Sequence, residues 1–371
     1  MEHRREKSSE HILICLLMAA ALMNAVLLSG CGGGNEKSAA FSQGETEEDG
    51  KKEISIGLSF DSFVIERWLR DRDVFTATAQ ELGARVNVQN ANGDVEEQIS
   101  QIRYLISKGM DVIVIVAIDG DSLTDVVREA KEKGIRVVCY DRLILDSGAD
   151  LYVSFDNEKV GTLMGQALKD ALPEGGDIFE IMGSGSDNNV AEVKRGFEKE
   201  IRGTGLKIVY SSYCDKWLAE LAYDAVNEGL EENDGHIDGV MCGNDDLAGQ
   251  AIRALTEKRL AGTVPVVGQD AELSGCQRIV EGTQTMSVYK SVEEEASVAA
   301  KLSVALARGE DITDPDARIG VNSVINDGTY DVPCYTIDPV AVDRANMDQV
   351  IIDGGFHLRS EVYMNVADEE T

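Results

Sequence analysis

Charged and amide side chains stand directly after apolar, strand-like runs at several places in the sequence. The run "GIRVVCY" at 134–140 is followed by Asp141 and Arg142, "VMCG" by Asn244, and "VPVVGQ" by Asp270. Each of these side chains accepts or donates hydrogen bonds in fixed directions. Grouped together, they would form a polar site for a ligand that presents many hydrogen-bonding groups.

The chemistry of this set favours binding over bond breaking. Its members are Arg67, Trp68, Asp141, Arg142, Asp187, Asn188, Asn189, Trp217, Asn244, Asp270 and Lys290. The sequence has no Ser-His-Asp order, G-x-S-x-G motif or Walker loop, and "GSGSDNN" at 183–189 lacks the third glycine of a dinucleotide loop. Paired carboxylates can hydrolyse a glycoside. However, an Arg, Lys or Asn neighbour is expected to keep each carboxylate here ionised, which suits an acceptor better than a proton donor.

A monosaccharide fits this set of side chains. Each sugar hydroxyl both donates and accepts, so a dry site needs carboxylates and amides together with Arg, Lys and Asn, because an unpaired buried group costs about 1–3 kcal/mol. The C–H faces of a pyranose ring suit flat aromatic rings. The chain has two tryptophans, and both lie beside polar motifs, Trp68 in "ERW" and Trp217 in "YCDKW".

The elements that would position these residues alternate from residue 53 onward. Apolar runs such as "ISIGLSF" (54–60), "DVIVIVAI" (111–118) and "DIFEIM" (177–182) are separated by segments with helical periodicity. Strands that are apolar throughout, alternating with amphipathic helices, predict parallel sheets covered on both faces. Ligands bind at the carboxyl ends of the strands in such sheets, which is where the candidate residues fall.

Composition restricts the class of partner. The chain has 371 residues, with 67 Asp and Glu against 35 Lys and Arg, and a formal net charge of −32. Nucleic-acid contacts need clustered Lys and Arg, so nucleic acid is not expected as a partner. Past the targeting region the odd set Cys139, Cys214, Cys242, Cys276 and Cys334 shows no C-x-x-C. Neither a disulfide framework nor a metal site is indicated.

The N-terminus has the pattern of a targeting segment. A polar, partly basic stretch precedes an apolar run at 12–28 and then "LSGC" at 28–31. This last motif resembles the lipobox of bacterial lipoproteins, in which the signal peptide (1–30) is cut before a cysteine that becomes lipidated, here Cys31. The alternative is an ordinary transmembrane helix, for which the run is marginal in length. Residues 31–52 are rich in Gly, Ser and Glu and predict a disordered tether.

The remainder of the chain resembles the xylose-binding members of the bacterial sugar-binding proteins that feed ABC importers. The likeness covers about residues 53–360 and includes "ERW-x-x-DRD", "YDRLI", "SFDNEKVG", "SDNNV", "GND-x-x-AG", "VVGQDAEL", "GTQTMSVYK" and "VIIDGGFH". It implies sugar contacts by Arg67, Trp68, Asp141, Arg142, Asp187, Asn189, Trp217, Asn244, Asp270 and Lys290, with the two tryptophans on either side of the sugar ring. Other stretches also resemble aldose-binding proteins for glucose, galactose and arabinose, which stay open as ligands.

The resemblance also implies the architecture. It is an α/β fold of the type I periplasmic binding protein class, with two Rossmann-like lobes, parallel sheets and a three-strand hinge. The lobes are expected at 53–154 plus 288–330 and at 155–287 plus 331–366, with crossings near 155, 288 and 330. A monomer without cofactor or enzymatic activity is expected, anchored at the outer face of the cell membrane. An ABC permease is the expected partner, and a sensor kinase or chemoreceptor is the alternative. A sugar-responsive repressor of this fold would begin with a basic helix-turn-helix, whereas this chain begins with the lipobox-like motif and the tether.

Overall fold

The computed structural model describes residues 53–366, which belong to one compact unit. The predicted signal peptide, the tether and Cys31 lie outside the described residues. Within 53–366, no helix is both long enough and apolar enough to cross a membrane.

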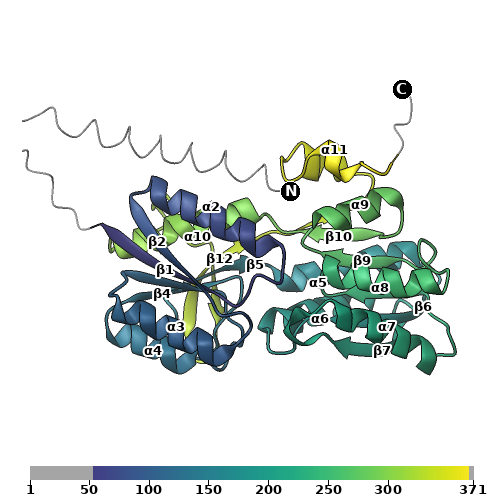
Figure 1. The fold of residues 1–371 in the computed structure, drawn as a ribbon, viewed down its shortest axis with the longest axis horizontal. Helices are drawn as coiled ribbons and strands as arrows, with labels where there is room; N and C mark the ends of the chain where they lie inside the picture. Colours follow the sequence, from purple (N-terminus) through teal and green to yellow (C-terminus); the bar gives the residue numbers. More distant parts are fainter. Residues whose placement is uncertain (1–52, 367–371) are drawn as a thin grey trace, which may run out of the picture. The chain divides into compact units, whose positions relative to one another are not determined.

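The first lobe is built on a seven-stranded sheet. Its strand order is β11-β12-β5-β4-β3-β1-β2, and every neighbouring pair is parallel except β11 and β12. The strands are β1 (Ile54–Phe60), β2 (Ala84–Asn90), β3 (Val112–Ile115), β4 (Arg136–Tyr140), β5 (Leu151–Phe155), β11 (Ser323–Asn326) and β12 (Asp331–Ile337). The helices are α2 (Arg67–Glu81), α3 (Val95–Ser107), α4 (Thr124–Glu132) and α10 (Val292–Ala307) (Figure 1).

Alternation along the central strands explains why both faces of this sheet are covered. Val112 and Val114 of β3 belong to the same apolar cluster as α2 and α10, whereas Ile113 and Ile115 pack with α3 and α4. Successive side chains of a strand point to opposite faces, so a strand that is apolar at every position needs helices on both sides. This confirms the prediction of a doubly covered parallel sheet.

The second lobe is built on a six-stranded sheet. Its order is β13-β10-β9-β8-β6-β7, with only the β13–β10 pair antiparallel. The strands are β6 (Gly176–Met182), β7 (Leu206–Tyr213), β8 (Gly239–Cys242), β9 (Val266–Gln269), β10 (Met286–Tyr289) and β13 (Val340–Val342). The helices are α5 (Asn157–Ala171), α6 (Asn188–Ile201), α7 (Glu220–Glu232), α8 (Asp245–Glu257), α9 (Leu273–Glu281) and α11 (Arg359–Val362), with a 3₁₀ turn at Asp215–Trp217 and a π-helical turn at Asp348–Ile352.

The chain passes between the two sheets three times. The passages follow β5, β10 and β12, near residues 156, 290 and 338. The third lies later than the expected position near 330, because β12 pairs in parallel with β5 and so belongs to the first sheet. The expected assignment of 331–337 to the second lobe is therefore corrected.

Two glycines allow α5 and α6 to pack closely. A Cβ atom at Gly161 would lie 1.9 Å from the Val193 carbonyl oxygen, and one at Gly196 would lie 1.9 Å from the Glu158 carbonyl oxygen. Both neighbours are backbone atoms, so any larger residue would push the helices apart.

We therefore expect Gly161→Ala to destabilise the protein by about 1–3 kcal/mol, the usual cost of overpacking. Denaturant unfolding measures the change. Gly249→Ala is the matched control, because its Cβ would meet only the flexible end of Arg278, at 3.1 Å. Equal stability of Gly161→Ala and the wild type would contradict the close packing of α5 on α6.

Candidate functional site

A cavity lies between the carboxyl ends of the strands of the two lobes. Nine of the ten predicted contact residues line it. The lining residues are Ile65, Arg67, Trp68, Asp141, Arg142, Asn157, Met182, Gly183, Asp187, Asn189, Val190, Val193, Trp217, Met241, Gly243, Gln269, Asp270 and Lys290.

Arg67 is the most heavily paired cation of the site. At the start of α2, its guanidinium contacts Asp71 one turn along the helix, Asp141 after β4 at 3.0 Å, and Glu295 of α10. Asp270 of the second lobe lies 4.0 Å away. Burial lowers the pKa of Arg67, but the surrounding carboxylates outweigh it and raise the pKa well above its usual value. The guanidinium therefore stays charged in a buried position.

Asp141 links the two lobes directly. Its Oδ2 accepts from Arg67 Nη1, and its Oδ1 accepts from Asn189 Nδ2 of α6, both at 3.0 Å. Its carbonyl oxygen also accepts from Asn189 Nδ2, at 3.0 Å, and from the Tyr152 hydroxyl, at 2.9 Å. Burial raises the pKa of this carboxyl, but Arg67, Lys290 and Arg142 outweigh it and the net pKa is lowered. The predicted ionised acceptor is confirmed here.

Arg142 makes a second link between the lobes. Its Nη1 donates to Asp61 Oδ2 at 2.8 Å, and its Nε forms an ion pair with Asp187 Oδ2 at 2.7 Å. Asp187 also caps α6 by accepting from the Asn189 backbone N–H. Burial outweighs Arg142 and raises the pKa of Asp187, so the cationic neighbour offsets only part of the cost of burying this carboxyl. Asn188 lies outside the cavity lining and accepts from the Leu143 backbone N–H.

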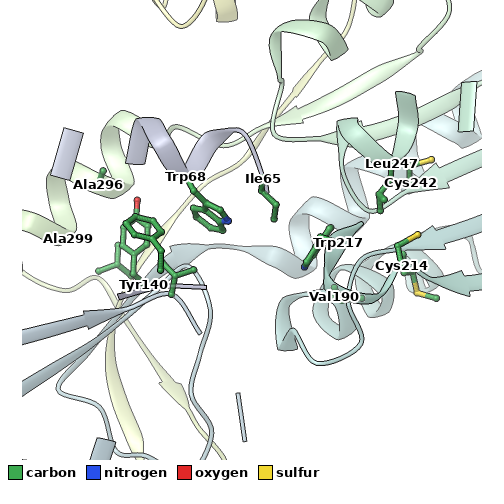
Figure 2. Close-up of a cluster of buried hydrophobic side chains, with 14 of the residues drawn as sticks. Ile65, Trp68, Tyr140, Val190, Cys214, Trp217, Cys242, Leu247, Ala296 and Ala299 are labelled. Atoms are coloured by element: carbon green, nitrogen blue, oxygen red, sulfur yellow. The ribbon is translucent and has the colours of Figure 1, made fainter. Parts of the chain in front are cut away.

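The two tryptophans line the cavity from different lobes. Trp68 belongs to α2 and Trp217 to the 3₁₀ turn after β7, and Figure 2 shows their side chains with Ile65 between them in the view. Gly183 makes room for Trp217, since a Cβ there would lie 2.2 Å from the ring. Within the described part of the chain, neither buried indole Nε1 has a hydrogen-bond partner. Both N–H groups are thus available as donors.

Asp270 and Lys290 come from adjacent strand ends of the second sheet. Lys290 Nζ lies 3.0 Å from Asp270 Oδ1. Asp270 and Ala271 both have positive φ, 89° and 49°, a conformation that costs energy for residues other than glycine. The turn places the Asp270 side chain in the cavity wall.

Asn244 is not among the lining residues; Gly243 takes that place. The Asn244 Oδ1 accepts from the Leu247 N–H and caps α8. Among residues 53–366, the buried Asn244 Nδ2 has no hydrogen-bond partner. Sequence reasoning also missed acidic partners and wall residues, namely Asp61, Asp71, Glu295, Asn157, Gln269, Ile65, Met182 and Met241. Asp61 and Asp71 did carry local signals, because Asp61 directly follows the apolar run 54–60 and Asp71 stands four residues after Arg67 on one helix.

The cysteines lie apart from this chemistry. All five in the described residues are buried and free, and no group of three or more His, Cys, Asp or Glu side chains in 53–366 is placed to hold a metal ion. Burial raises the pKa of the Cys139 thiol to about 12. A thiol with this pKa is an inert apolar side chain.

Comparison with known proteins identifies the family. Residues 56–311 match the model described as periplasmic binding protein domain. The chain belongs to the periplasmic binding protein family. It has the type I fold of two α/β lobes, and the family is one of binding proteins without enzymatic activity, which sets aside the glycosidase hypothesis.

Curated relatives and solved structures agree with this assignment. The chain is 42% identical to the D-xylose-binding periplasmic protein of Haemophilus influenzae, over 84% of this chain and 93% of that one. It is 31% identical to a multiple sugar-binding periplasmic receptor of Rhizobium radiobacter, over 83% of this chain and 92% of that one. A solute-binding protein of an ABC transporter from Clostridium phytofermentans, solved with β-D-glucose, matches with a TM-score of 0.75 and 29% identity, over 83% of this chain and 99% of that one.

The buried pairing of Arg142 has a measurable consequence. Arg142→Ala would leave the buried carboxyls of Asp61 and Asp187 without their cation, so we expect a loss of about 3–5 kcal/mol in unfolding free energy. Chemical denaturation measures it. Arg103→Ala is the control, because its ion pair with Glu129 is exposed and is expected to matter little. A loss no larger than that of the control would show that Arg142 is not needed to compensate these carboxyls.

Proposed function

We propose that this protein is an extracytoplasmic solute-binding protein that captures a monosaccharide, D-xylose in the first place, and delivers it to an ABC-type permease. One observation carries the proposal. The cavity combines two tryptophans from different lobes with ionic and amide groups from both lobes, and all of these side chains are buried.

The proposed contacts divide by chemistry. Trp68 and Trp217 provide flat faces for the C–H surfaces of the sugar ring. Hydroxyl groups would bind to the acidic and amide oxygens and to the cationic donors of Arg67, Asp141, Arg142, Asp187, Asn189, Asp270 and Lys290. Asn244 was predicted as a further contact, but it is not among the lining residues and its Oδ1 caps α8, so we propose for it a supporting position at the start of that helix.

The choice of xylose rests on the relatives. Two curated relatives, from Haemophilus influenzae and Escherichia coli, are both named D-xylose-binding periplasmic proteins, each at 42% identity. Relatives near 30% identity include multiple sugar-binding proteins. The second candidate is therefore a receptor for another aldose, such as glucose, galactose or arabinose, that signals to a membrane histidine kinase or chemoreceptor.

The anchor is a separate part of the proposal. We propose that Cys31, after cleavage of residues 1–30, carries lipid and holds the binding unit at the outer face of the cell membrane. The "LSGC" motif supports this, and more than one acyl chain gives stable anchoring.

Removing either aromatic face is expected to weaken sugar binding. Trp217→Ala and Trp68→Ala should each lower xylose affinity by about 30- to 1,000-fold, the range of large interface contacts. Calorimetric titration with a panel of aldoses measures this and ranks the sugars. Trp217→Phe, which keeps a ring, is the matched variant and should lose less. Wild-type affinity in both alanine variants would mean that the tryptophans do not contact the ligand.

Lipidation is tested by labelling. Cys31→Ala should accumulate as an uncleaved precursor that incorporates no labelled fatty acid, because the acceptor thiol is gone. Labelling equal to that of the wild type would rule out Cys31 as the anchor.

A further inference from the structure

The motif "VIIDGGFH" at 350–357 has no place in the cavity wall, yet it lies close behind it. After the π-helical turn, Gly354 and Gly355 reverse the chain, and Gly355 has a positive φ of 75°. The turn brings Phe356 into an apolar cluster that contains Ala271 of the second lobe and Val292 at the start of α10. Phe356 is buried there, and its ring meets that of Tyr289 nearly edge-on, with centroids 4.9 Å apart.

The same segment also contacts the first lobe. Arg70 of α2 donates from Nη1 to the Phe356 carbonyl oxygen at 2.7 Å, and its guanidinium stacks over the Phe356 ring, 4.5 Å from the centroid. Arg70 also pairs with Glu293 at the start of α10. Charge-assisted hydrogen bonds and cation–π contacts are among the stronger polar interactions outside a core. Arg70 stands one turn along α2 from Arg67, so this contact is attached to a cavity-lining helix.

His357 makes the matching contact on the second lobe. Its Nε2 lies 2.9 Å from the Ala271 carbonyl oxygen, which only accepts, so the ring donates. Burial lowers the pKa of His357, and the neutral ring with a proton on Nε2 is the form that serves this bond. Ala271 follows Asp270 in the strained turn, and Tyr289 precedes Lys290. Residues 356–357 thus contact the neighbours of both charged groups that the second lobe contributes from β9 and β10.

We propose that residues 354–358 form a strap that ties α2 of the first lobe to the strand ends carrying Asp270 and Lys290, and that this strap stabilises the closed arrangement of the lobes around the ligand. The proposal rests on the proposed function and adds to it a set of positioning residues. The cavity lining includes none of the three residues Arg70, Phe356 and His357. They affect binding indirectly, because they hold the helix that carries Arg67 and the turn that carries Asp270. In this way they increase the fraction of protein in the binding-competent form.

The strap makes a kinetic prediction. A contact that links the two lobes slows their separation, so its loss should raise the sugar dissociation rate and leave association nearly unchanged. In the purified full-length protein, we expect Arg70→Ala and Phe356→Leu each to weaken xylose binding about five- to tenfold. Both tryptophans of the chain line the cavity, so stopped-flow tryptophan fluorescence follows both rates.

Two matched variants separate this effect from general damage. Arg72→Ala removes another arginine of α2, paired at the surface with Asp73, and should bind as the wild type does. His357→Gln keeps a donor for the Ala271 carbonyl and should lose less affinity than His357→Ala. Wild-type affinity and dissociation rate in both Arg70→Ala and Phe356→Leu would overturn the strap.

A ligand-free measurement distinguishes failure of the strap from failure of the proposed function. The Phe356 backbone N–H donates to the Ile351 carbonyl oxygen at 2.9 Å, so its hydrogen exchange reports whether the segment is held. We expect faster exchange at Phe356 in Arg70→Ala than in the wild type and in Arg72→Ala, whichever sugar the protein binds. Unchanged exchange would contradict the strap, whereas absence of binding to every aldose by the wild type would contradict the proposed function alone.

Discussion

A buried positive charge at Arg67 sets the conditions that the rest of the site must meet. Removing a guanidinium from water costs several kcal/mol unless carboxylates compensate it. The compensation here comes from α2 itself, from the end of β4, from α10 and, at 4.0 Å, from the turn after β9 in the other lobe. One charge therefore constrains elements that are far apart in the sequence. It also explains why β4 and β9 are followed by the acidic residues Asp141 and Asp270, since both face the same buried ion.

The compensation leaves the site with an excess of acid. The cations Arg67, Arg142 and Lys290 are surrounded by Asp61, Asp71, Asp141, Asp187, Asp270 and Glu295. Burial raises the pKa of Asp61, Asp71, Asp187 and Glu295, while Asp141, close to three cations, has a lowered pKa. The site thus offers carboxylate acceptors together with guanidinium and ammonium donors. Such a mixture matches hydroxyl groups, which both donate and accept.

Much of this arrangement could be predicted from the sequence. Continuous apolar runs such as 54–60 and 111–118 predicted parallel sheets, and polar residues at the ends of such runs predicted a shared site. Strand β2 was not predicted, because its side chains are mostly half-buried and its sequence has no continuous apolar run. The lobe to which β12 belongs was predicted wrongly, because its pairing with β5, and not its composition, decides which sheet it joins. Glu295 was not predicted as a site residue, because acidic residues are common in the first turn of a helix and only the fold brings Glu295 to Arg67. Asn244 was predicted at the correct strand end, but its side-chain oxygen already accepts a hydrogen bond from the Leu247 backbone N–H of α8.

Small-angle X-ray scattering can test whether the two lobes meet around a polar ligand. It should be measured on the compact unit from residue 53 onward, with and without xylose and with the other aldoses. Closure of the lobes around a sugar should reduce the radius of gyration when a sugar that binds is added. Asp270→Ala, which removes an acceptor at the cavity wall, should stay folded and show no such change. Tight sugar binding with an unchanged radius of gyration in the wild type would contradict the account and would indicate a preformed pocket within one lobe.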